Sequence, residues 1–337
     1  MALFGFEPDV WLPVAFAILM GASILAYVIL DGYDLGVGIL MGNATREERD
    51  VMVGSIGPFW DANETWLVLG IGLLLVAFPA AHGVILTALY LPVALMLVGL
   101  TLRGVAFEFR VKAQSGLREI WDRIFVAGSL LAAATQGYML GFYIVGFEPS
   151  FAAHAFAVLT GICLAAGYAF IGATWLVLKT EGALHDRAVG MARTCLWLAA
   201  LGMVAVSLAT PIASPRIFAK WFSFPEIILL APIPLVTAGL FLALWIFLRR
   251  MPRVDRSLDI VPFVGAVGLF ALGFFGFAYS FYPYLVVDRI TVWQAAAAPE
   301  SLMLIFVGAC VVLPVIVAYS AFAYWVFRGK ATALRYD

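Results

Sequence analysis

Long apolar runs constrain this chain more than any other feature of its sequence. Each run is about 20 residues long or longer, enough to cross the ~30 Å hydrocarbon core of a bilayer as a helix. The runs lie at 11–40, 58–78, 80–102, 124–146, 152–178, 194–213, 226–248, 260–284 and 301–327. Only 12% of the residues are charged, whereas a soluble domain carries about a quarter. The sequence therefore predicts an all-α polytopic membrane protein, with nine transmembrane helices in a single integral membrane domain, 1–337.

The basic residues predict how these spans are oriented. If successive loops alternate between the two sides of the membrane, seventeen of the twenty Lys and Arg fall on the side opposite the N-terminus. Because cytoplasmic loops carry an excess of Lys and Arg, we expect the N-terminus outside and the C-terminus in the cytoplasm. The formal net charge of −1 and the absence of a basic tail argue against a nucleic-acid partner.

The first apolar run carries two acids near its inner end. Asp31 and Asp34 are three residues apart, so they share one face of a helix. Two carboxylates this close, partly removed from water, can hold a proton between them. Gly32 and Gly36 form a small-xxx-small pair that would let another helix approach closely. The alternative is that both acids lie in headgroup water and merely end the span.

The second run is too short to cross a membrane unless it includes polar residues. From Trp66 to Phe78 it has thirteen apolar residues, about 20 Å as a helix. Extending the helix back to Pro58 brings it to 21 residues. The residues that the extension draws in are Trp60, Asp61, Asn63, Glu64 and Trp66. Ionisable groups at membrane depth are costly, so they usually mark ion or proton paths or pair with one another.

Charged residues that could meet these acids follow the third run. Arg103, Glu108 and Arg110 are expected toward the same side of the membrane, within reach of the first two spans. The arrangement fits a proton path. It also fits a set of structural ion pairs that lock the first three spans together, and the two interpretations are compatible.

The histidines and cysteines do not predict a metal or haem site in this chain. His82 and His154 fall in outer turns and His185 in an inner loop. No two imidazoles are therefore expected to face each other inside the bundle and ligate a haem iron. The three cysteines are far apart and have no metal-binding spacing. An aromatic string from Phe270 to Tyr284 could line a slot for a quinone or lipid, although an interfacial aromatic belt is the favoured interpretation.

Three sequence blocks together resemble one known family. They run from Asp31 to Gly38, from Ser55 to Trp66 and from Arg103 to Arg110, in that order within the first 110 residues. Their order and spacing resemble subunit II of cytochrome bd-type quinol oxidases. The later segments Phe281–Tyr284 and Thr291–Gln294 are similar to the family's last-loop pattern. The compact region between the fifth and seventh spans resembles the shorter, cyanide-insensitive branch.

The resemblance implies an architecture and a set of partners. The expected fold has two four-helix bundles, about 1–147 and 148–290, and a peripheral ninth helix with its tail at 291–337. Two haems b and one haem d are expected in the partner subunit I, which oxidises quinol. This chain would bind no haem itself. Whether it binds a quinone or a lipid is an open alternative. Membrane lipids and a small single-span subunit are further expected partners, in the bacterial cytoplasmic (inner) membrane.

The resemblance also implies roles for individual residues. Acids matching Asp31, Asp34 and Asp61 border the family's proposed proton route from the cytoplasm, and the Trp matching Trp66 lies near the proposed oxygen path. We therefore expect a proton pathway made of Asp31, Asp34, Asp61, Glu64, Arg103 and Glu108. The residues expected to be structural are Gly32, Gly36, Trp60, Asn63 and Arg110.

The favoured function is thus a haem-free accessory subunit of a terminal oxidase that oxidises quinol and reduces oxygen to water. The chain would support the haem subunit and help to form the proton route, and also the oxygen route. A proton-coupled secondary transporter is the alternative, in which the same acids bind the coupling ion. Transporters often show inverted repeats and broken helices at mid-membrane. In this sequence the acids lie toward one face of the membrane and no repeat is visible, which counts against this alternative.

Overall fold

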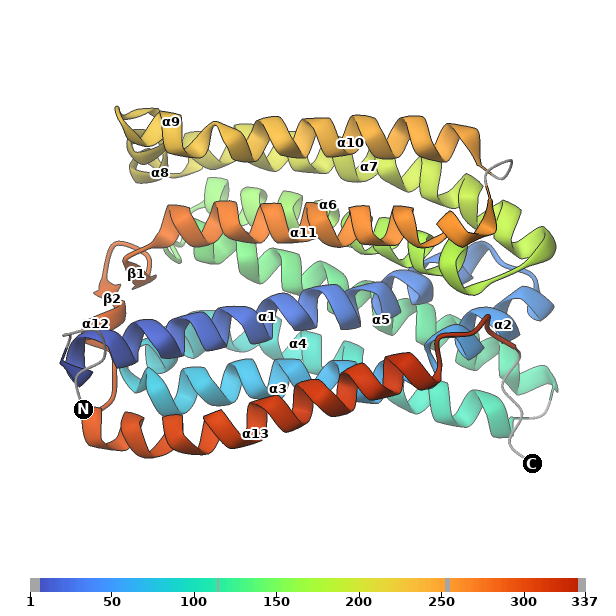
Figure 1. The fold of residues 1–337 in the computed structure, drawn as a ribbon, viewed down its shortest axis with the longest axis horizontal. Coiled ribbons are helices and arrows are strands. Elements are labelled where there is room, and N and C mark those ends of the chain that lie inside the picture. The colour runs from blue at the N-terminus through green and yellow to red at the C-terminus, as the bar shows by residue number, and fades with distance from the viewer. Residues whose placement is uncertain (1–6, 114, 252–254, 333–337) are drawn as a thin grey trace.

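The computed structural model describes residues 7–113, 115–251 and 255–332. Within these ranges nine helices are long and apolar enough to cross a membrane, which confirms the predicted number. The main helices are α1 (Pro8–Leu40), α3 (Trp60–Ala77), α4 (Pro79–Lys112), α5 (Ser115–Ile144), α6 (Phe151–Lys179), α7 (Gly182–Ala213), α10 (Pro232–Arg250), α11 (Ile260–Phe281) and α13 (Pro299–Val326). Figure 1 shows them running side by side along the length of the molecule.

Short elements connect the long helices at both ends of the bundle. One end, here called the α2 end, carries η1 (Met41–Asn43), α2 (Arg46–Ile56) and η2 (Arg256–Leu258). The opposite end carries α8 (Pro215–Phe222), α9 (Glu226–Leu230) and α12 (Val292–Ala295), with an antiparallel hairpin of β1 (Tyr284–Val286) and β2 (Ile290–Thr291) (Figure 1). The helix α9 leads into α10, and together they form the seventh span.

Several helices extend well beyond the apolar runs that predict them. The third run is predicted to end at residue 102, but α4 continues to Lys112, and α7 begins at Gly182 rather than at residue 194. Hydropathy marks the part of a helix that lies in hydrocarbon, whereas Arg, Lys and Glu are good helix formers that continue the same helix into water. The helix α3 begins at Trp60, so Asp61 and Glu64 are helical, as the span-length argument predicts.

The helix α2 is held by a capping box at its N-terminus. The Thr45 hydroxyl accepts a hydrogen bond from the Glu48 backbone N–H, and the Glu48 carboxylate accepts one from the Thr45 N–H. That Thr45 N–H, assisted by Arg187, holds the pKa of the Glu48 carboxyl below its usual value. The cap therefore fixes where the chain turns after α1.

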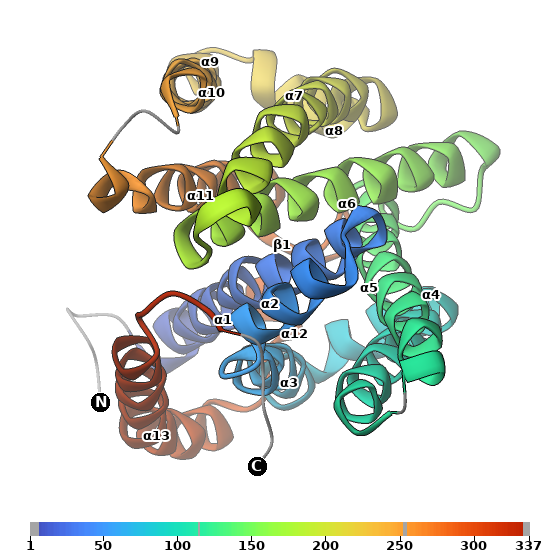
Figure 2. The same ribbon diagram turned by 90° about the vertical axis from the view of Figure 1, so that its right-hand side faces the viewer.

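The long helices pack as two groups of neighbours. In the first group α1 contacts α3 and α5, and α4 contacts α3 and α5; in the second α6 contacts α7 and α11, and α10 does the same. Both α1 and α5 also pack along α6, so the two groups share a broad contact. The helix α13 lies outside both groups, beside α1 (Figure 2).

Glycines allow α1 and α6 to approach closely. A Cβ at Gly36 would overlap the backbone carbonyl of Tyr168, and a Cβ at Gly172 would overlap the backbone of Gly36. A Cβ at Gly32 would lie 2.7 Å from the Tyr168 ring. Gly32 and Gly36 thus lie where α6 comes closest, and this contact orients the acids of α1.

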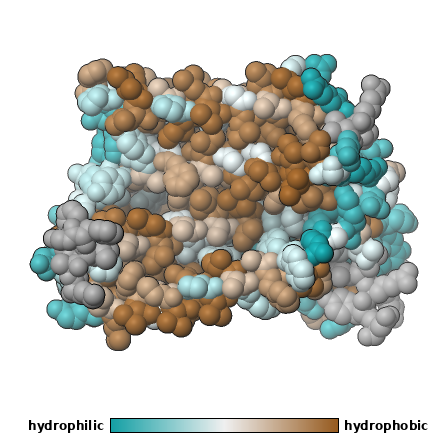
Figure 3. Space-filling view, in the orientation of Figure 1, coloured by the Kyte–Doolittle hydropathy of each residue, from teal (hydrophilic) through white to brown (hydrophobic). Residues whose placement is uncertain are grey.

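The surface has the character of a membrane protein. Figure 3 shows an apolar band across the middle of the molecule, with hydrophilic residues gathered at both ends. Large apolar side chains such as Ile212 on α7, Leu235 on α10 and Leu304 on α13 are exposed. Exposed apolar area of this extent is suited to lipid tails rather than to water.

The close contact of α1 with α6 predicts a difference between two glycine substitutions. Gly36→Ala should lower the melting temperature of the detergent-solubilised complex by several degrees, because its Cβ collides with backbone that cannot move aside. Gly72→Ala on α3, where an added Cβ would meet no other described part of the chain within 4 Å, should leave it unchanged or slightly raised, since Ala favours helix over Gly. Equal melting temperatures for both variants would contradict this account of the packing.

Candidate functional site

An arginine and two aspartates lie together inside the first group of helices. Arg103 of α4 donates from Nη1 to Asp31 Oδ1 at 2.7 Å, and its Nη2 lies 3.8 Å from Asp34 Oδ2. All three side chains have 0% exposure. Asp31 lies nine residues before the C-terminal end of α1, about 14 Å along the axis, so the site is not at the helix end. We call these three residues the Arg103 cluster.

The Arg103 cluster has unused hydrogen-bonding capacity. Within the described part of the chain, Asp31 Oδ2, Asp34 Oδ1 and the Nε and Nη2 atoms of Arg103 are buried without a hydrogen-bond partner. Buried polar groups of this kind usually bond to protein or to ordered water. With both acids ionised the cluster would carry one net negative charge. It can therefore take up one proton and become neutral.

Asn63 of α3 connects the Arg103 cluster to two tyrosines. Its Nδ2 lies 2.8 Å from Asp34 Oδ2 and 2.8 Å from the Tyr33 hydroxyl, while its Oδ1 accepts from the Tyr324 hydroxyl at 2.9 Å. The two hydroxyls are 2.6 Å apart. Asn63, Tyr33 and Tyr324 thus form a closed hydrogen-bonded ring, here called the Asn63 ring, which joins α1, α3 and α13.

A second polar connection runs from Asp31 toward the middle of the span. Tyr27 is one helical turn before Asp31 on α1, and its hydroxyl accepts from Gln136 Nε2 of α5 at 2.6 Å. The Tyr168 hydroxyl of α6 donates to Gln136 Oε1 at 2.7 Å. Polar groups therefore line a path from the Arg103 cluster into the contact between the two groups of helices.

Asp61 and Glu64 lie on the outer face of α3. Asp61 is exposed and Glu64 is partly buried, and both line a groove of about 460 Å³ between α3 and α4. Trp60 lies in the same groove and covers the Arg103 guanidinium, which is 5.8 Å from the ring centroid. Trp66 is partly buried farther along α3 and is not among the residues that line the groove.

Glu108 does not join the Arg103 cluster. It follows Arg103 by five residues, which turns it about 140° around α4, and its side chain is exposed. Arg110 lies farther along the helix, where it is buried and pairs with Asp122 of α5 and with Asp50 of α2. The structure thus separates the acid and the two arginines of this sequence block.

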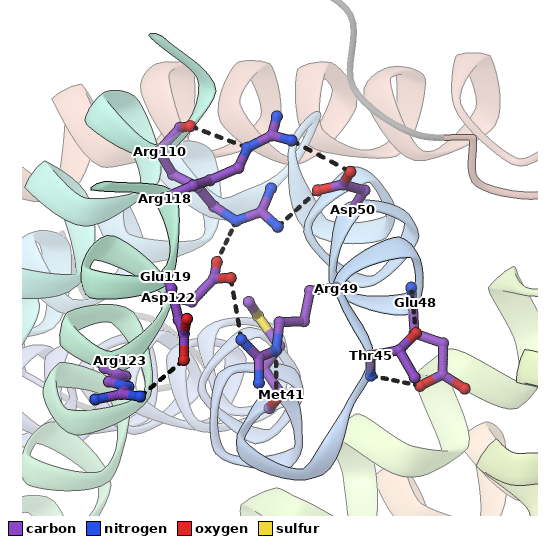
Figure 4. A network of polar contacts seen from close by, with 10 residues as sticks. All are labelled: Met41, Thr45, Glu48, Arg49, Asp50, Arg110, Arg118, Glu119, Asp122 and Arg123. Carbon is purple, nitrogen blue, oxygen red and sulfur yellow. Dashed lines mark hydrogen bonds and ion pairs between the residues drawn. The ribbon is translucent and has the colours of Figure 1, made fainter. Parts of the chain in front are cut away.

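Arg110 belongs to a separate ionic network at the α2 end, shown in Figure 4. Arg118 pairs with Asp50 at 3.4 Å, and Arg49 pairs with Asp122 at 3.2 Å and also donates to the Met41 carbonyl. The network joins α2, α4 and α5. Its acids are bonded to arginines, so its geometry fits the structural role predicted for Arg110.

Sequence reasoning missed the polar groups around the acids. Tyr33 lies inside the Asp31–Gly38 block, but it is uncharged and so does not stand out in an apolar run. Tyr324 lies in a run that looks uniformly apolar. Gln136 was detectable, because an amide inside an apolar run needs a buried partner.

The chain is similar to known proteins over almost its whole length. A family model described as "Cytochrome bd terminal oxidase subunit II" matches residues 12–327. The "Cytochrome bd ubiquinol oxidase subunit 2" of Bacillus subtilis is 27% identical over 345 residues, covering 96% of each chain. The "Cytochrome bd-I ubiquinol oxidase subunit 2" of Escherichia coli strain K12 is 26% identical over 371 residues, covering 94% of each.

A solved structure shares the fold. A chain of the bd oxidase from Geobacillus thermodenitrificans aligns with a TM-score of 0.76 at 16% identity, covering 95% of this chain and 99% of that one. The family match begins within α1 and ends just after α13, so it includes every residue of the Arg103 cluster. These findings confirm the resemblance that the three sequence blocks indicate. The chain is a multi-pass protein of the bacterial inner membrane and belongs to the cytochrome bd terminal oxidase subunit II family.

Proposed function

We propose that this chain is the haem-free accessory subunit of a terminal oxidase that oxidises quinol and reduces oxygen to water. In this proposal it packs against a haem-bearing subunit I, and its acids carry protons toward the site of oxygen reduction. Membership of the subunit II family supports the assembly. The observation that carries the proton role is the Arg103 cluster, whose acids are fully buried within a span and keep unpartnered oxygen atoms.

The haems are assigned to the partner subunit. They would supply electron transfer and the reduction of oxygen, while this chain would hold and move protons. Two of its three histidines are engaged elsewhere: both ring nitrogens of His185 contact carboxylates, of Asp186 and Asp259, and His154 Nδ1 contacts the Tyr138 hydroxyl. This arrangement supports a chain without haem ligands of its own.

The proposed route begins at the α2 end, which the basic loops assign to the cytoplasm. A proton reaching Asp34 or Asp31 neutralises the excess negative charge of the Arg103 cluster. Glu64 and Asp61 then offer acceptors in the groove on the far side of Trp60. Carboxylates facing lipid at membrane depth are costly, so we infer that subunit I covers this groove and receives the proton there.

The transporter alternative is not supported by the comparisons. A family match over residues 12–327 and relatives named as oxidase subunits favour the oxidase. An oxygen path past Trp66 remains part of the proposal, supported by the resemblance alone.

One prediction of the proton route concerns Asp34→Asn in the purified oxidase complex. It should lower quinol-driven oxygen consumption by about tenfold or more, because the amide cannot take up and release a proton. The haem content, read from the visible spectrum, should stay unchanged, since Asp31 remains as the close partner of Arg103. Asp9→Asn, at the opposite end of the same helix, serves as the matched control. Full turnover in the Asp34→Asn complex would refute the proton route.

A second prediction concerns Arg103→Leu, which leaves two buried carboxylates without their cation. The loss of one partner from a buried ion pair costs about 3–5 kcal/mol, so little intact complex should be recovered. Arg123→Leu removes an exposed pair with Glu119, where side-chain exposure is 78% and 62%, and should leave the yield unchanged. The measurement is the yield of haem-containing complex from each variant after size-exclusion chromatography. Equal yields from the Arg103 and Arg123 variants would show that Arg103 is not needed for the fold.

A third prediction separates the two glutamates of the predicted pathway. Glu64→Gln should slow oxygen consumption several-fold, because Glu64 lies in the groove beside Trp60. Glu108→Gln should have little effect, because that side chain is exposed on another face of α4. Turnover of the two complexes at matched haem concentration provides the measurement. The reverse order of effects would place the route along the other face of α4.

A further inference from the structure

The short helix α8 connects two membrane-crossing helices at the end of the bundle opposite α2 (Figure 1). The helix α7 ends at Ala213 and the seventh span begins at Glu226, so the chain leaves the membrane and re-enters it at this end. With eight residues α8 is about 12 Å long, too short to cross a ~30 Å hydrocarbon core. It therefore lies near the level at which the membrane surface meets α7.

The two cations of α8 point into the protein. Lys220 Nζ donates to the carbonyl oxygens of Tyr279 at 2.6 Å and of Tyr282 at 2.5 Å. Arg216 Nη1 donates to the Ser280 carbonyl at 3.2 Å. These carbonyls belong to the last turn of α11 and to the residue that follows it, where acceptors have no partner within their own helix. Both cations thus cap α11 instead of facing outward.

The phenylalanines of α8 point the other way. Phe218 is 53% exposed and Phe222 57%, and their ring centroids lie 4.9 Å apart on one face of the helix. Phe224, just beyond the helix end, is exposed as well. On the opposite face Ile217 is fully buried, and Trp221 packs in the same apolar cluster.

This arrangement is the reverse of what water favours. A helix that faces water turns its charged residues outward and its apolar residues toward the core. The helix α8 instead keeps its cations inside and exposes aromatic rings. Such a face suits an apolar surrounding, as in helices that lie in the plane of a membrane surface with Phe or Trp immersed.

The position of α8 in the bundle favours lipid over a protein partner. The proposed function places subunit I against the groove between α3 and α4. Figure 2 shows α8 beside α7, with α6 and α1 between it and α3. Ile212, in the last turn of α7, is exposed too, so the apolar surface of α7 extends to the start of α8. The surface next to α8 is therefore of the kind that lipid tails cover.

The seventh span is weakly held at the same end of the bundle. Among the described residues of α10, Leu244 and Leu248 are the buried ones, and both lie in the half nearer the α2 end. The half that follows α9 has no buried residue among those described, and neither has α9. Packing within the chain thus does little to fix where this span begins.

We propose that α8 is an interfacial helix whose phenylalanines, Phe218, Phe222 and Phe224, insert into the lipid leaflet opposite the α2 end and anchor the start of the seventh span. The contact is with acyl chains and not with an anionic headgroup, because Lys220 is bonded to carbonyls and Arg216 also pairs with Asp288 at 2.6 Å. The inference goes beyond the proposed function and does not depend on the proton route.

The test uses the complete oxidase in phosphatidylcholine nanodiscs, with a nitroxide spin label on Phe222→Cys. The accessible cysteines, including the exposed Cys310, are first replaced by serine. Power saturation compares collisions with oxygen, which concentrates in lipid, and with a nickel chelate that stays in water. We expect several-fold more collisions with oxygen than with the chelate, as for Leu235→Cys on α10. Arg289→Cys, exposed in the turn between β1 and β2, should show the opposite ratio.

Three results would overturn the insertion of α8. A label at position 222 that is as open to the nickel chelate as the one at position 289 would show that this face meets water. A label shielded from both reagents would show that a protein covers it. A ratio that changes when phosphatidylglycerol replaces part of the phosphatidylcholine would assign the contact to headgroups. The haem spectrum confirms that each labelled complex is assembled.

The anchoring role has a separate readout. With the label at Leu235→Cys, the double substitution Phe218→Ser with Phe222→Ser should increase the mobility of the label, because the start of the seventh span is no longer held. Phe151→Ser, which removes a 90% exposed ring from the start of α6 at the same end, should leave the mobility unchanged. Equal mobility in the double variant and the unmodified chain would overturn the anchor.

Discussion

A guanidinium held against two carboxylates inside a membrane bundle is the interaction on which the rest of this structure depends. Removing three ionisable groups from water is costly, and the contact between Arg103 and Asp31 offsets the cost only because the surrounding helices hold it at 2.7 Å. Asp34 is held more loosely, at 3.8 Å from the same guanidinium. The cluster thus combines one firm pair with one acid that keeps the capacity to change its protonation state.

The fold serves this cluster at several levels. The glycine contact between α1 and α6 fixes the rotation of α1, so that its acids face α4 and α3 rather than lipid. The ionic network at the α2 end ties α2, α4 and α5 together near the place where α4 leaves the apolar band. The groove between α3 and α4 lies on the outer face of the bundle, and Trp60, which lines it, also covers the Arg103 guanidinium. Helix packing, charge pairing and span length therefore all favour the same arrangement, in which Asp31, Asp34 and Arg103 meet inside the bundle.

The sequence predicts much of this site and omits its most distant members. Asp31, Asp34 and Arg103 are predictable because charge is rare in long apolar runs, and the short second run forces Asn63 into the membrane. The separation of Glu108 from Arg103 depends on helical phase and on which face meets a neighbour. Tyr324 lies 291 residues from Tyr33. In the sequence, a tyrosine within an apolar run is indistinguishable from a residue that only packs, and tertiary structure alone brings the two hydroxyls together. Helix ends in water are equally hard to predict, as α4 shows.

The central claim is that protons consumed in oxygen reduction pass through the Arg103 cluster from the α2 end. Proton uptake during a single turnover, followed with a pH dye confined to one side of oriented vesicles, tests it most directly. The account predicts that protons disappear from the side that the α2 end faces, and that removal of the Asp34 carboxyl delays this uptake without delaying haem reduction by quinol. Uptake from the opposite side, or uptake at an unchanged rate, would contradict it.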